Sequence, residues 1–225
     1  AKVVSHDETR IVLTGVLVSC VGSTLKMVAT DSYRLAVSET ELDSPCPEEF
    51  EAVIAGSFLQ DIASLPQSED PITIALNDNQ IVVTYRDTTF INRRIEGTFP
   101  NYKQLIAEGH STRATLSTHA LTDAVRRVSL LSNKVSPVQV RVDAESGVVT
   151  LLTNSQDIGN AQENLICEVD GESVDIAFNF TFMLDGLNSI DTDAVHLDLF
   201  GPMKPGILRA AEGENFLYLI MPVRV

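Results

Sequence analysis

Alternation of apolar and polar residues predicts β-hairpins at two places in the chain. Val16–Thr30 (VLVSCVGSTLKMVAT) alternates on both sides of a glycine, and Val138–Asn154 (VQVRVDAESGVVTLLTN) repeats that design later in the chain. A period of two residues is typical of half-buried strands, and a glycine between two such runs favours a tight turn. Two further strand pairs are predicted at 72–86 and 195–209. The chain is therefore expected to be rich in antiparallel β-structure.

Apolar residues at helical spacing predict three helices, which we place at 53–65, 116–133 and 176–190. The first and the last of these stand at the same place in the order of elements, and they align Phe58 with Phe182. Hairpin, helix and strand pair thus follow one another twice. Such an order is the pattern of an internal repeat.

The repeat predicts two α+β domains of similar build, and we place them at 1–105 and 106–225. Domains of roughly 100–150 residues are typical, so the length suits two of them. The helix at 116–133 lacks a full counterpart in the first domain, and Lys2–Arg10 (KVVSHDETR) is expected to be the tail of that counterpart, which suggests a truncated start. Each copy is expected to close with a strand that carries an apolar residue before proline, namely Phe99-Pro100 and Met221-Pro222.

Composition places the chain among ordinary globular proteins. Apolar residues make up 44% and charged residues 21% of the 225 positions, which excludes disordered, collagen-like and coiled-coil chains. The 16 Lys and Arg against 31 Asp and Glu give a formal net charge of −15. This balance argues against a protein whose whole surface binds nucleic acid or an anionic membrane, and it leaves room for a local basic patch.

The sequence offers little catalytic chemistry. Cys20, Cys46 and Cys167 lie far apart, the four histidines are scattered, and no metal-ligand spacing or known catalytic motif occurs, so we expect no metal and no cofactor. Unclustered cysteines, and the lack of a signal peptide or an apolar span, indicate a cytoplasmic protein. Asp31, after Ala29-Thr30, is the most suggestive single acid, and turn preferences favour a role in capping backbone N–H groups. The residues by themselves predict a non-catalytic protein that acts by binding.

Five segments in a fixed order resemble motifs of one protein family. VATDSYRLAV (28–37) resembles the [V/A]ATDGHRLA signature in the middle domain of the bacterial sliding clamp, the β subunit of DNA polymerase III. The other four, which cover essentially the whole chain together with the first, are the first strand ETRIVLTGVLV (8–18), the G-x-F-P-x-Y linker in EGTFPNYKQLI (96–106), the helix end RRVSLLSNK (126–134) and the C-terminal YLIMPVRV (218–225). The match is to the second and third of the family's three domains.

The resemblance implies a fold and a function. The fold would be two clamp-type α+β domains, with helices on one inner face and antiparallel sheets on the outer face. Two family subunits meet head to tail in a ring around duplex DNA, so the function would be that of a processivity factor in DNA replication. It would dock the polymerase, the clamp loader and repair proteins through short peptides such as Gln-Leu-x-Leu-Phe. The full-length protein would be a homodimer located in the cytoplasm at the nucleoid, and this fragment is expected to be a monomer.

The resemblance also assigns residues. In the family, the partner peptide binds between the second and third domains, next to the C-terminus. Carried over one by one, the peptide-binding residues would be Arg10, Leu13, Thr30, Ser32, Tyr33, Arg34, Leu35, Pro100, Leu105, Phe182, Pro205, Leu219, Met221, Pro222, Val223 and Arg224. DNA-facing residues would be Arg126, Arg127 and Lys134, and the dimer interface would include Leu130 and Leu131. The basic lining is thin, because the helices predicted at 53–65 and 176–190 contain no Lys or Arg.

Two departures from the family pattern concern the peptide site. Ser32 stands where the family usually has glycine, and Tyr33 stands where it usually has histidine. An added side-chain atom and a larger ring at the rim are expected to change which peptides fit. Gln104 also replaces a residue that is basic in many relatives.

Two other hypotheses belong to different functional classes. An α+β hydrolase-like enzyme would use Asp31 with Arg34 in an interdomain cleft, and it would need a carboxylate with a strongly shifted pKa beside a buried small-molecule pocket. A generic interaction module unrelated to replication is the other alternative. Two superposable domains with helices on one face would favour the clamp over both.

Overall fold

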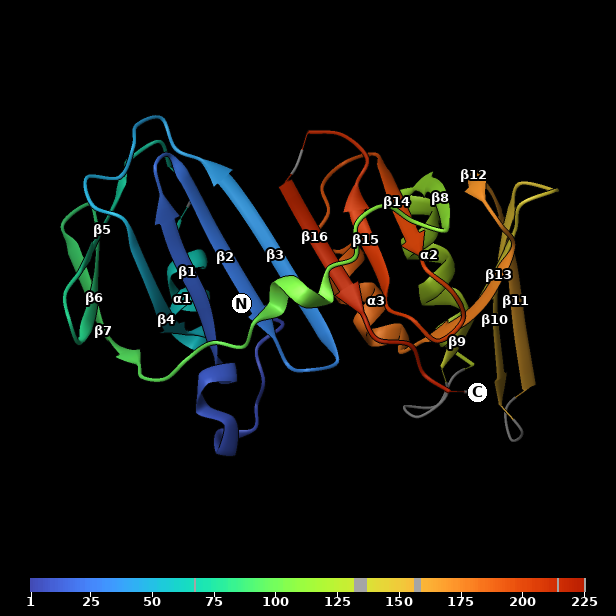
Figure 1. The fold of residues 1–225 in the computed structure, drawn as a ribbon, viewed down its shortest axis with the longest axis horizontal. Helices are drawn as coiled ribbons and strands as arrows, with labels where there is room; N and C mark the ends of the chain where they lie inside the picture. The colour runs from blue at the N-terminus through green and yellow to red at the C-terminus, as the bar shows by residue number, and fades with distance from the viewer. Residues whose placement is uncertain (67, 132–136, 156–158, 214, 225) are drawn as a thin grey trace. The chain divides into compact units, whose positions relative to one another are not determined.

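The computed structural model describes residues 1–66, 68–131, 137–155, 159–213 and 215–224. It divides into two compact units, Ala1–Asn101 (unit 1) and Tyr102–Val225 (unit 2), whose elements are labelled in Figure 1. The expected domain boundary after residue 105 coincides with the end of a short 3₁₀ helix, η2 (Tyr102–Leu105), and stays a prediction.

Unit 1 contains a single antiparallel sheet. The strands run in the order β3-β2-β1-β4-β7-β6-β5. The elements of unit 1 are η1 (Glu8–Thr14), β1 (Gly15–Val21), β2 (Thr24–Thr30), β3 (Arg34–Glu41), β4 (Phe50–Ala55), α1 (Gly56–Ala63), β5 (Ile72–Leu76), β6 (Gln80–Tyr85) and β7 (Thr88–Ile95).

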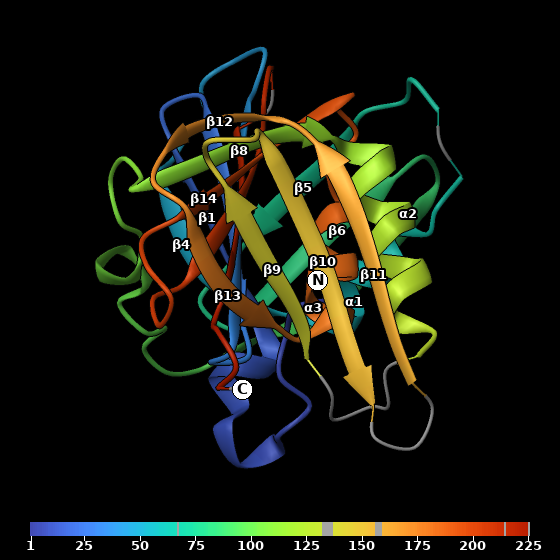
Figure 2. The ribbon, with the colours of Figure 1, turned by 90° about the vertical axis from the view of Figure 1, so that its right-hand side faces the viewer.

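Unit 2 contains two antiparallel sheets, of order β12-β8-β14-β15-β16 and β11-β10-β9-β13. Helix α2 packs against α3 and against β10 and β11, and Figure 2 shows it beside the four-stranded sheet. After η2, the elements are β8 (Thr112–Ser117), α2 (Thr118–Ser129), β9 (Val138–Asp143), β10 (Val148–Ser155), β11 (Gly159–Ile166), β12 (Glu168–Gly171), β13 (Val174–Phe178), α3 (Phe180–Leu187), β14 (Ala194–Leu199), β15 (Gly206–Ala210) and β16 (Asn215–Ile220).

The strand pairings confirm the internal repeat. In unit 1, β1 pairs with β2 and β4, β2 pairs with β3, and β6 pairs with β5 and β7. In unit 2, β9 pairs with β10 and β13, β10 pairs with β11, and β15 pairs with β14 and β16. Helices α1 and α3 occupy the same place in the two series. The fold class is therefore α+β with two similar antiparallel units, as predicted.

All three predicted helices are too long: each begins too early, and each runs past the last helical residue, which is Ala63, Ser129 or Leu187. The first residues of each belong to a strand, β4, β8 or β13, and the helix follows directly. Caps mark two of the true starts: Ser117 Oγ accepts from Ala120 N at 3.3 Å before α2, and Asn179 Oδ1 accepts from Thr181 N at 2.9 Å before α3. A side-chain oxygen at this position satisfies a backbone N–H that the helix leaves unpaired. Apolar residues continue across each junction, so the pattern alone does not show where the strand period gives way to the helix period.

Two other predictions are wrong at the ends of elements. Residues 1–7 form no helix tail. Asp7 instead caps the 3₁₀ helix η1, and the first strand begins at Gly15 rather than near residue 8. The two apolar-proline pairs lie after β7 and β16 rather than on them. Proline lacks the N–H that a paired strand needs, so a strand ends more readily before it than through it.

The core of unit 2 encloses a charged group. Leu121, Val125 and Val128 on α2 are fully buried, and each such side chain contributes roughly 1.5–3 kcal/mol to folding. Asp198 on β14 is also fully buried, and it lies between two arginines of the neighbouring strands, Arg113 on β8 and Arg209 on β15. The two guanidinium groups form ion pairs with this carboxylate. Without them, burying its charge would cost much folding free energy.

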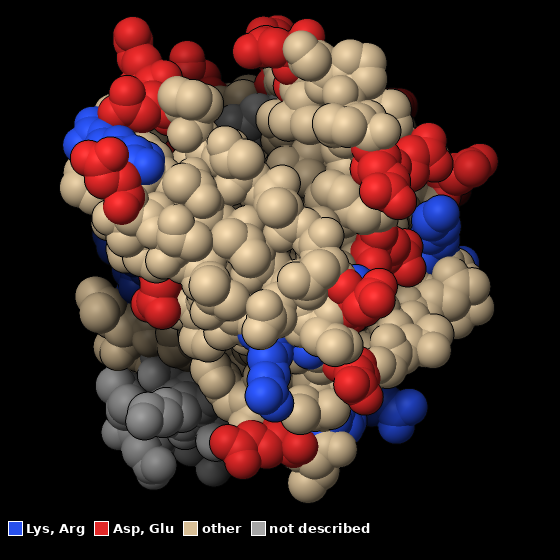
Figure 3. Space-filling view, turned by 90° about the vertical axis from the view of Figure 1, so that its left-hand side faces the viewer, with Lys and Arg blue, Asp and Glu red and all other residues tan. Residues whose placement is uncertain are grey.

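Unit 1 leaves apolar side chains uncovered on the sheet end that carries β5–β7. Ile72 and Ile74 on β5 are 48% and 39% exposed, and Ile91 on β7 is 60% exposed. Figure 3 shows this end as a broad area without charge, with Asp, Glu, Lys and Arg gathered at its rim. Exposed apolar area on an edge strand favours association with other chains.

Candidate functional site

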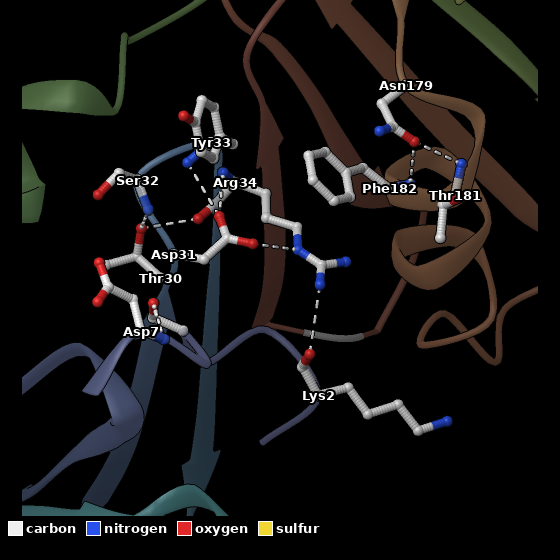
Figure 4. Close-up of polar contacts among 11 residues, drawn as sticks. Lys2, Asp7, Thr30, Asp31, Ser32, Tyr33, Arg34, Asn179, Thr181 and Phe182 are labelled. Carbon is white, nitrogen blue, oxygen red and sulfur yellow. Dashed lines mark hydrogen bonds and ion pairs between the residues drawn. The ribbon is translucent and has the colours of Figure 1, made fainter. Parts of the chain in front are cut away.

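The turn between β2 and β3 is organised by Asp31. Its Oδ1 accepts hydrogen bonds from the backbone N–H groups of Tyr33 (2.9 Å) and Arg34 (3.0 Å). Its Oδ2 forms an ion pair with Arg34 Nε at 2.9 Å (Figure 4). Aspartate is favoured in such turns because its short side chain reaches the backbone two residues on. Both carboxylate oxygens therefore serve the structure of the turn, as the capping interpretation predicts.

Thr30 and Ser32 complete the turn. Thr30 Oγ1 donates to Arg34 O at 2.7 Å and accepts from Ser32 N at 3.1 Å. Ser32 has a φ of 80°, in the left-handed region that costs a residue with a Cβ roughly 1–2 kcal/mol. Glycine adopts this backbone conformation without strain, which agrees with the glycine that the resemblance leads one to expect at this position.

Arg10 links the turn to η1. Its Nη1 donates to Ser32 Oγ at 2.8 Å, and its Nε pairs with Asp7 Oδ2 at 2.9 Å. Hydrogen bonds from Thr9, and then from Arg10, hold the pKa of Asp7 below its usual range. The guanidinium group of Arg10 is thus fixed from two sides while it stays exposed.

The predicted site residues of unit 1 differ in accessibility. Tyr33 is 63% exposed and Pro100 is exposed, whereas Leu13, Leu35 and Thr30 are buried. The leucines therefore lie within the packed interior rather than on the surface. We call the polar and aromatic group at the turn, Arg10, Thr30, Ser32, Tyr33 and Arg34, the turn set.

The C-terminal residues form a second group in unit 2. Leu219 on β16 is buried and lies opposite Ile207 of β15, whereas Met221 is 40% exposed. Val223 N donates to Ala177 O at 2.8 Å, which fixes the end of the chain against β13. We call Met221, Pro222, Val223 and Arg224 the tail set.

The remaining predicted peptide-binding residues lie on three other elements of unit 2. Phe182 is in the first turn of α3, where its N–H donates to Asn179 Oδ1 at 3.4 Å (Figure 4). Pro205 precedes β15 and is half-buried, and Leu105 ends η2 and is exposed.

The basic residues predicted to face DNA are engaged with the protein itself. Arg127 Nη2 lies 2.6 Å from Glu163 Oε2, and this contact holds the pKa of Glu163 below its usual range. Arg126 pairs with Asp123 at 3.4 Å and donates to Asn188 Oδ1 at 2.9 Å. Lys134 lies outside the described residues. The positive charge on α2 is thus largely neutralised at close range.

The residues predicted at a dimer interface lie at the C-terminal end of α2. Leu130 is 78% exposed and Leu131 is half-buried. An exposed leucine in this position suits a contact with another chain but does not require one.

The described residues contain no group of three or more His, Cys, Asp or Glu side chains that could hold a metal ion. Within the same part of the chain, no helix is long and apolar enough to cross a bilayer. Each set by itself carries groups that suit contact with a peptide: the turn set has the exposed Tyr33 beside guanidinium groups and hydroxyls, and the tail set has exposed Met and Val side chains beside Arg224.

Sequence reasoning missed a group of residues around a hollow in unit 2. Met203, on the loop before β15, contributes to this hollow together with Val223 of the tail set and Gln139 of β9. These residues come from distant segments, so no local motif marks them. The one available signal was an exposed methionine in the loop GPMKPG, because an unpaired loop rarely needs a large apolar side chain.

Comparison with known proteins identifies both units. Residues 2–101 match the family described as DNA polymerase III beta subunit, central domain, and residues 103–224 match its C-terminal domain. Beta sliding clamps of Synechocystis sp. and Staphylococcus aureus are each 33% identical over 98% of this chain. The solved structure of a DNA polymerase sliding clamp from Bacillus subtilis covers the whole chain with a TM-score of 0.95 at 28% identity. The chain spans 60% and 59% of the length of the two curated relatives and 60% of the Bacillus subtilis chain.

Proposed function

This chain belongs to the family of DNA polymerase III beta subunits, and we propose that it acts as part of a sliding clamp that encircles duplex DNA and holds the replicative polymerase to it. The observation that carries this proposal is the match of two successive family domains, in order, over nearly all residues. A clamp is a processivity factor without catalysis of its own. The use of both Asp31 oxygens by the turn supports this reading over a hydrolase.

We propose that partner proteins dock through short peptides of the Gln-Leu-x-Leu-Phe kind. The exposed members of the turn set and the tail set would contact the peptide directly. The buried residues Leu13, Leu35 and Leu219 would support them from below, and Pro100, Leu105, Phe182 and Pro205 would add apolar contacts. An apolar surface with a few orienting polar groups is the usual composition of such a site.

Contact with DNA is proposed to be weak and independent of sequence. Arg126 and Arg127 already bind carboxylates, and the chain carries a net charge of −15. Encirclement needs little affinity, so a closed ring would retain DNA where single contacts do not. For this chain we expect binding to linear duplex DNA on the order of 10⁻⁴ M or weaker at physiological salt.

Assembly and location complete the proposal. The full-length protein would form a homodimeric ring through contacts that include Leu130 and Leu131, whereas this chain would be a monomer in dilute solution. A light-scattering mass that stays at twice the 24.5 kDa chain mass on dilution would contradict the monomer. The site of action would be the cytoplasm, at the nucleoid.

The docking proposal is tested by calorimetry with a Gln-Leu-x-Leu-Phe peptide. A short peptide immobilises few groups and buries a modest area, so we expect a dissociation constant of about 1 μM, or about −8 kcal/mol. Met221→Ala should weaken binding by about 1–3 kcal/mol, because a few buried anchors carry most of the energy of an interface. Arg34→Ala should also weaken it.

Matched controls separate docking from general effects on the protein. Ile91→Ala removes an apolar side chain from β7 that is 60% exposed, against 40% for Met221, and Glu48→Ala removes a charge from an exposed loop. Both should leave the affinity unchanged. If no peptide binds, or if Met221→Ala has no more effect than Ile91→Ala, the tail set does not dock partners.

A further inference from the structure

A hollow of about 280 Å³ opens on one face of the four-stranded sheet of unit 2. Its floor is one row of residues across three strands, because Gln139 on β9 lies opposite both Leu152 on β10 and Ala177 on β13. Val138, Val140 and Val142, which alternate with these positions on β9, are fully buried. The hollow is therefore built on rigid paired strands rather than on a loop.

The walls of the hollow are apolar and exposed. Pro202 and Met203 form one wall from the loop between β14 and β15, and Val223 of the tail set forms another. Met203 is 54% exposed and Val223 is 36% exposed. The hydrogen bond from Val223 N to Ala177 O fixes the tail at this place. Large apolar side chains that stand in water around a concave surface gain free energy when a partner covers them.

The charges near the hollow point to the kind of partner. Lys204 and Arg224 follow Met203 and Val223 directly in the sequence, and among the described residues neither forms an ion pair. Every described arginine of unit 2 other than Arg224 does pair with a carboxylate, namely Arg113, Arg126, Arg127, Arg141 and Arg209. The two segments that form the walls of the hollow therefore each carry a cation without an ion pair among the described residues, in a chain of net charge −15, and such segments are complementary to an acidic partner.

We propose that this hollow binds an apolar side chain of a partner protein whose neighbouring residues in the sequence are acidic. The inference rests on the proposed peptide docking and extends it, since the tail set contributes Val223 to the hollow. The volume lies just below the roughly 300–1,000 Å³ of pockets for small molecules, which suits one side chain better than a complete ligand. The carboxylates of the partner would meet Lys204 and Arg224. Arg141 and Asp175, which form an ion pair at 3.0 Å, also line the hollow.

The test compares flanked and unflanked peptides by calorimetry. A core peptide carries Gln-Leu-x-Leu-Phe between Gly-Ser spacers, and two longer ones add Asp-Leu-Asp beyond the spacer at the N- or the C-terminal end. At least one flanked peptide should bind about tenfold more tightly than the core, from partial burial of one leucine and a surface ion pair. Flanks of Asp-Ser-Asp and of Ser-Leu-Ser should each increase the affinity by less. Added salt should reduce the increase in affinity only for peptides with acidic flanks.

Variants at exposed loop positions show which residues cause the higher affinity of the flanked peptides. Lys204→Glu and Met203→Ser should each abolish the advantage of the flank and leave the affinity of the core peptide unchanged. Lys103→Glu makes the same charge change at an exposed position on η2 and should leave the advantage intact. A flank advantage below twofold, or one that Lys103→Glu removes as fully as Lys204→Glu, overturns the proposal.

A second measurement separates this proposal from the docking function. An isolated Asp-Leu-Asp peptide at millimolar concentration should shift the backbone amide resonances of Gln139 and Ala177. These shifts would uphold the hollow even if the core peptide failed to bind, in which case only the proposed docking would be wrong. If the core peptide binds and the isolated flank shifts neither resonance, the hollow is not a subsite.

Discussion

Replacing Asp198 by asparagine should destabilise unit 2 far more than the loss of an ordinary ion pair. The Asp198 carboxylate is fully buried on β14. Its Oδ1 accepts from Arg113 Nε at 2.6 Å, and its Oδ2 accepts from Arg113 Nη2 at 2.8 Å and from Arg209 Nε at 3.2 Å. Asparagine keeps the size of the side chain but removes the charge and one acceptor oxygen. Two guanidinium groups then remain next to a neutral amide.

The magnitude follows from the burial of the three partners. Removing one member of a buried ion pair costs about 3–5 kcal/mol. The side chains of Arg113 and Arg209 are 30% and 31% exposed, so water relieves part of that cost. We therefore expect Asp198→Asn to lower the free energy of unfolding by about 3 kcal/mol.

A matched pair in the same unit provides the control. Arg141 and Asp175 also join adjacent strands, at 3.0 Å, but their side chains are 57% and 65% exposed. Asp175→Asn should cost only about 0–1 kcal/mol. Urea unfolding followed by circular dichroism gives both values, and hydrogen exchange of the β14 amides reports on unit 2 alone. Equal costs for the two variants would refute the argument that burial sets the value of the pair.

Three further outcomes are expected. At Ser32, where φ is 80°, Ser32→Gly should leave the free energy of unfolding unchanged or raise it in urea unfolding, because glycine carries no Cβ, whereas the β-branched Ser32→Val should lower it by about 1 kcal/mol. Burial raises the pKa of the Cys20 thiol to about 11. The thiol of the unfolded chain loses its proton above about pH 8.5, so the free energy of unfolding should fall as the pH rises from about 8.5 towards 11. This fall should be less steep in Cys20→Ala. On the exposed strand β5, Ile74→Lys should reduce the self-association that light scattering detects at high protein concentration, and it should change stability by less than about 0.5 kcal/mol.

The periodic pattern was enough to predict strands, their antiparallel pairing and the repeat, because each of these depends on residues close in sequence. The starts of the helices were not predictable in the same way. At Ser117 and Asn179 the side chain accepts a backbone N–H and the chain changes from strand to helix, yet the apolar residues continue across the junction. A single capping oxygen decides the boundary, and a window of many residues averages it away.

The candidate site was predictable only in part. The turn at Asp31 has a local signature, and the structure contains the capping hydrogen bonds that it implies. The hollow of unit 2 joins β9, β10, β13, a loop and the tail, so it has no signature in any one segment. Resemblance to a family found the tail set because its residues are contiguous. It did not identify Gln139 or Met203, because these residues line the same hollow as Val223 only in the folded chain.

Burial cannot be read from the pattern of one strand, and the two copies of the repeat show why. Ile72 and Ile74 of β5 occupy the positions that Val195 and Leu197 occupy on β14, and both strands alternate in the same way. The β14 residues are 0% and 1% exposed, whereas the β5 residues are 48% and 39% exposed. In unit 2, β8 pairs with the far edge of β14, and α2 packs against β8 and α3. Among the described residues of unit 1, β5 pairs with β6 alone, and no helix corresponds to α2. The alternation therefore fixes which face of a strand is apolar. The neighbouring strand and helix determine whether that face is buried. A residue becomes part of the core only when both conditions hold.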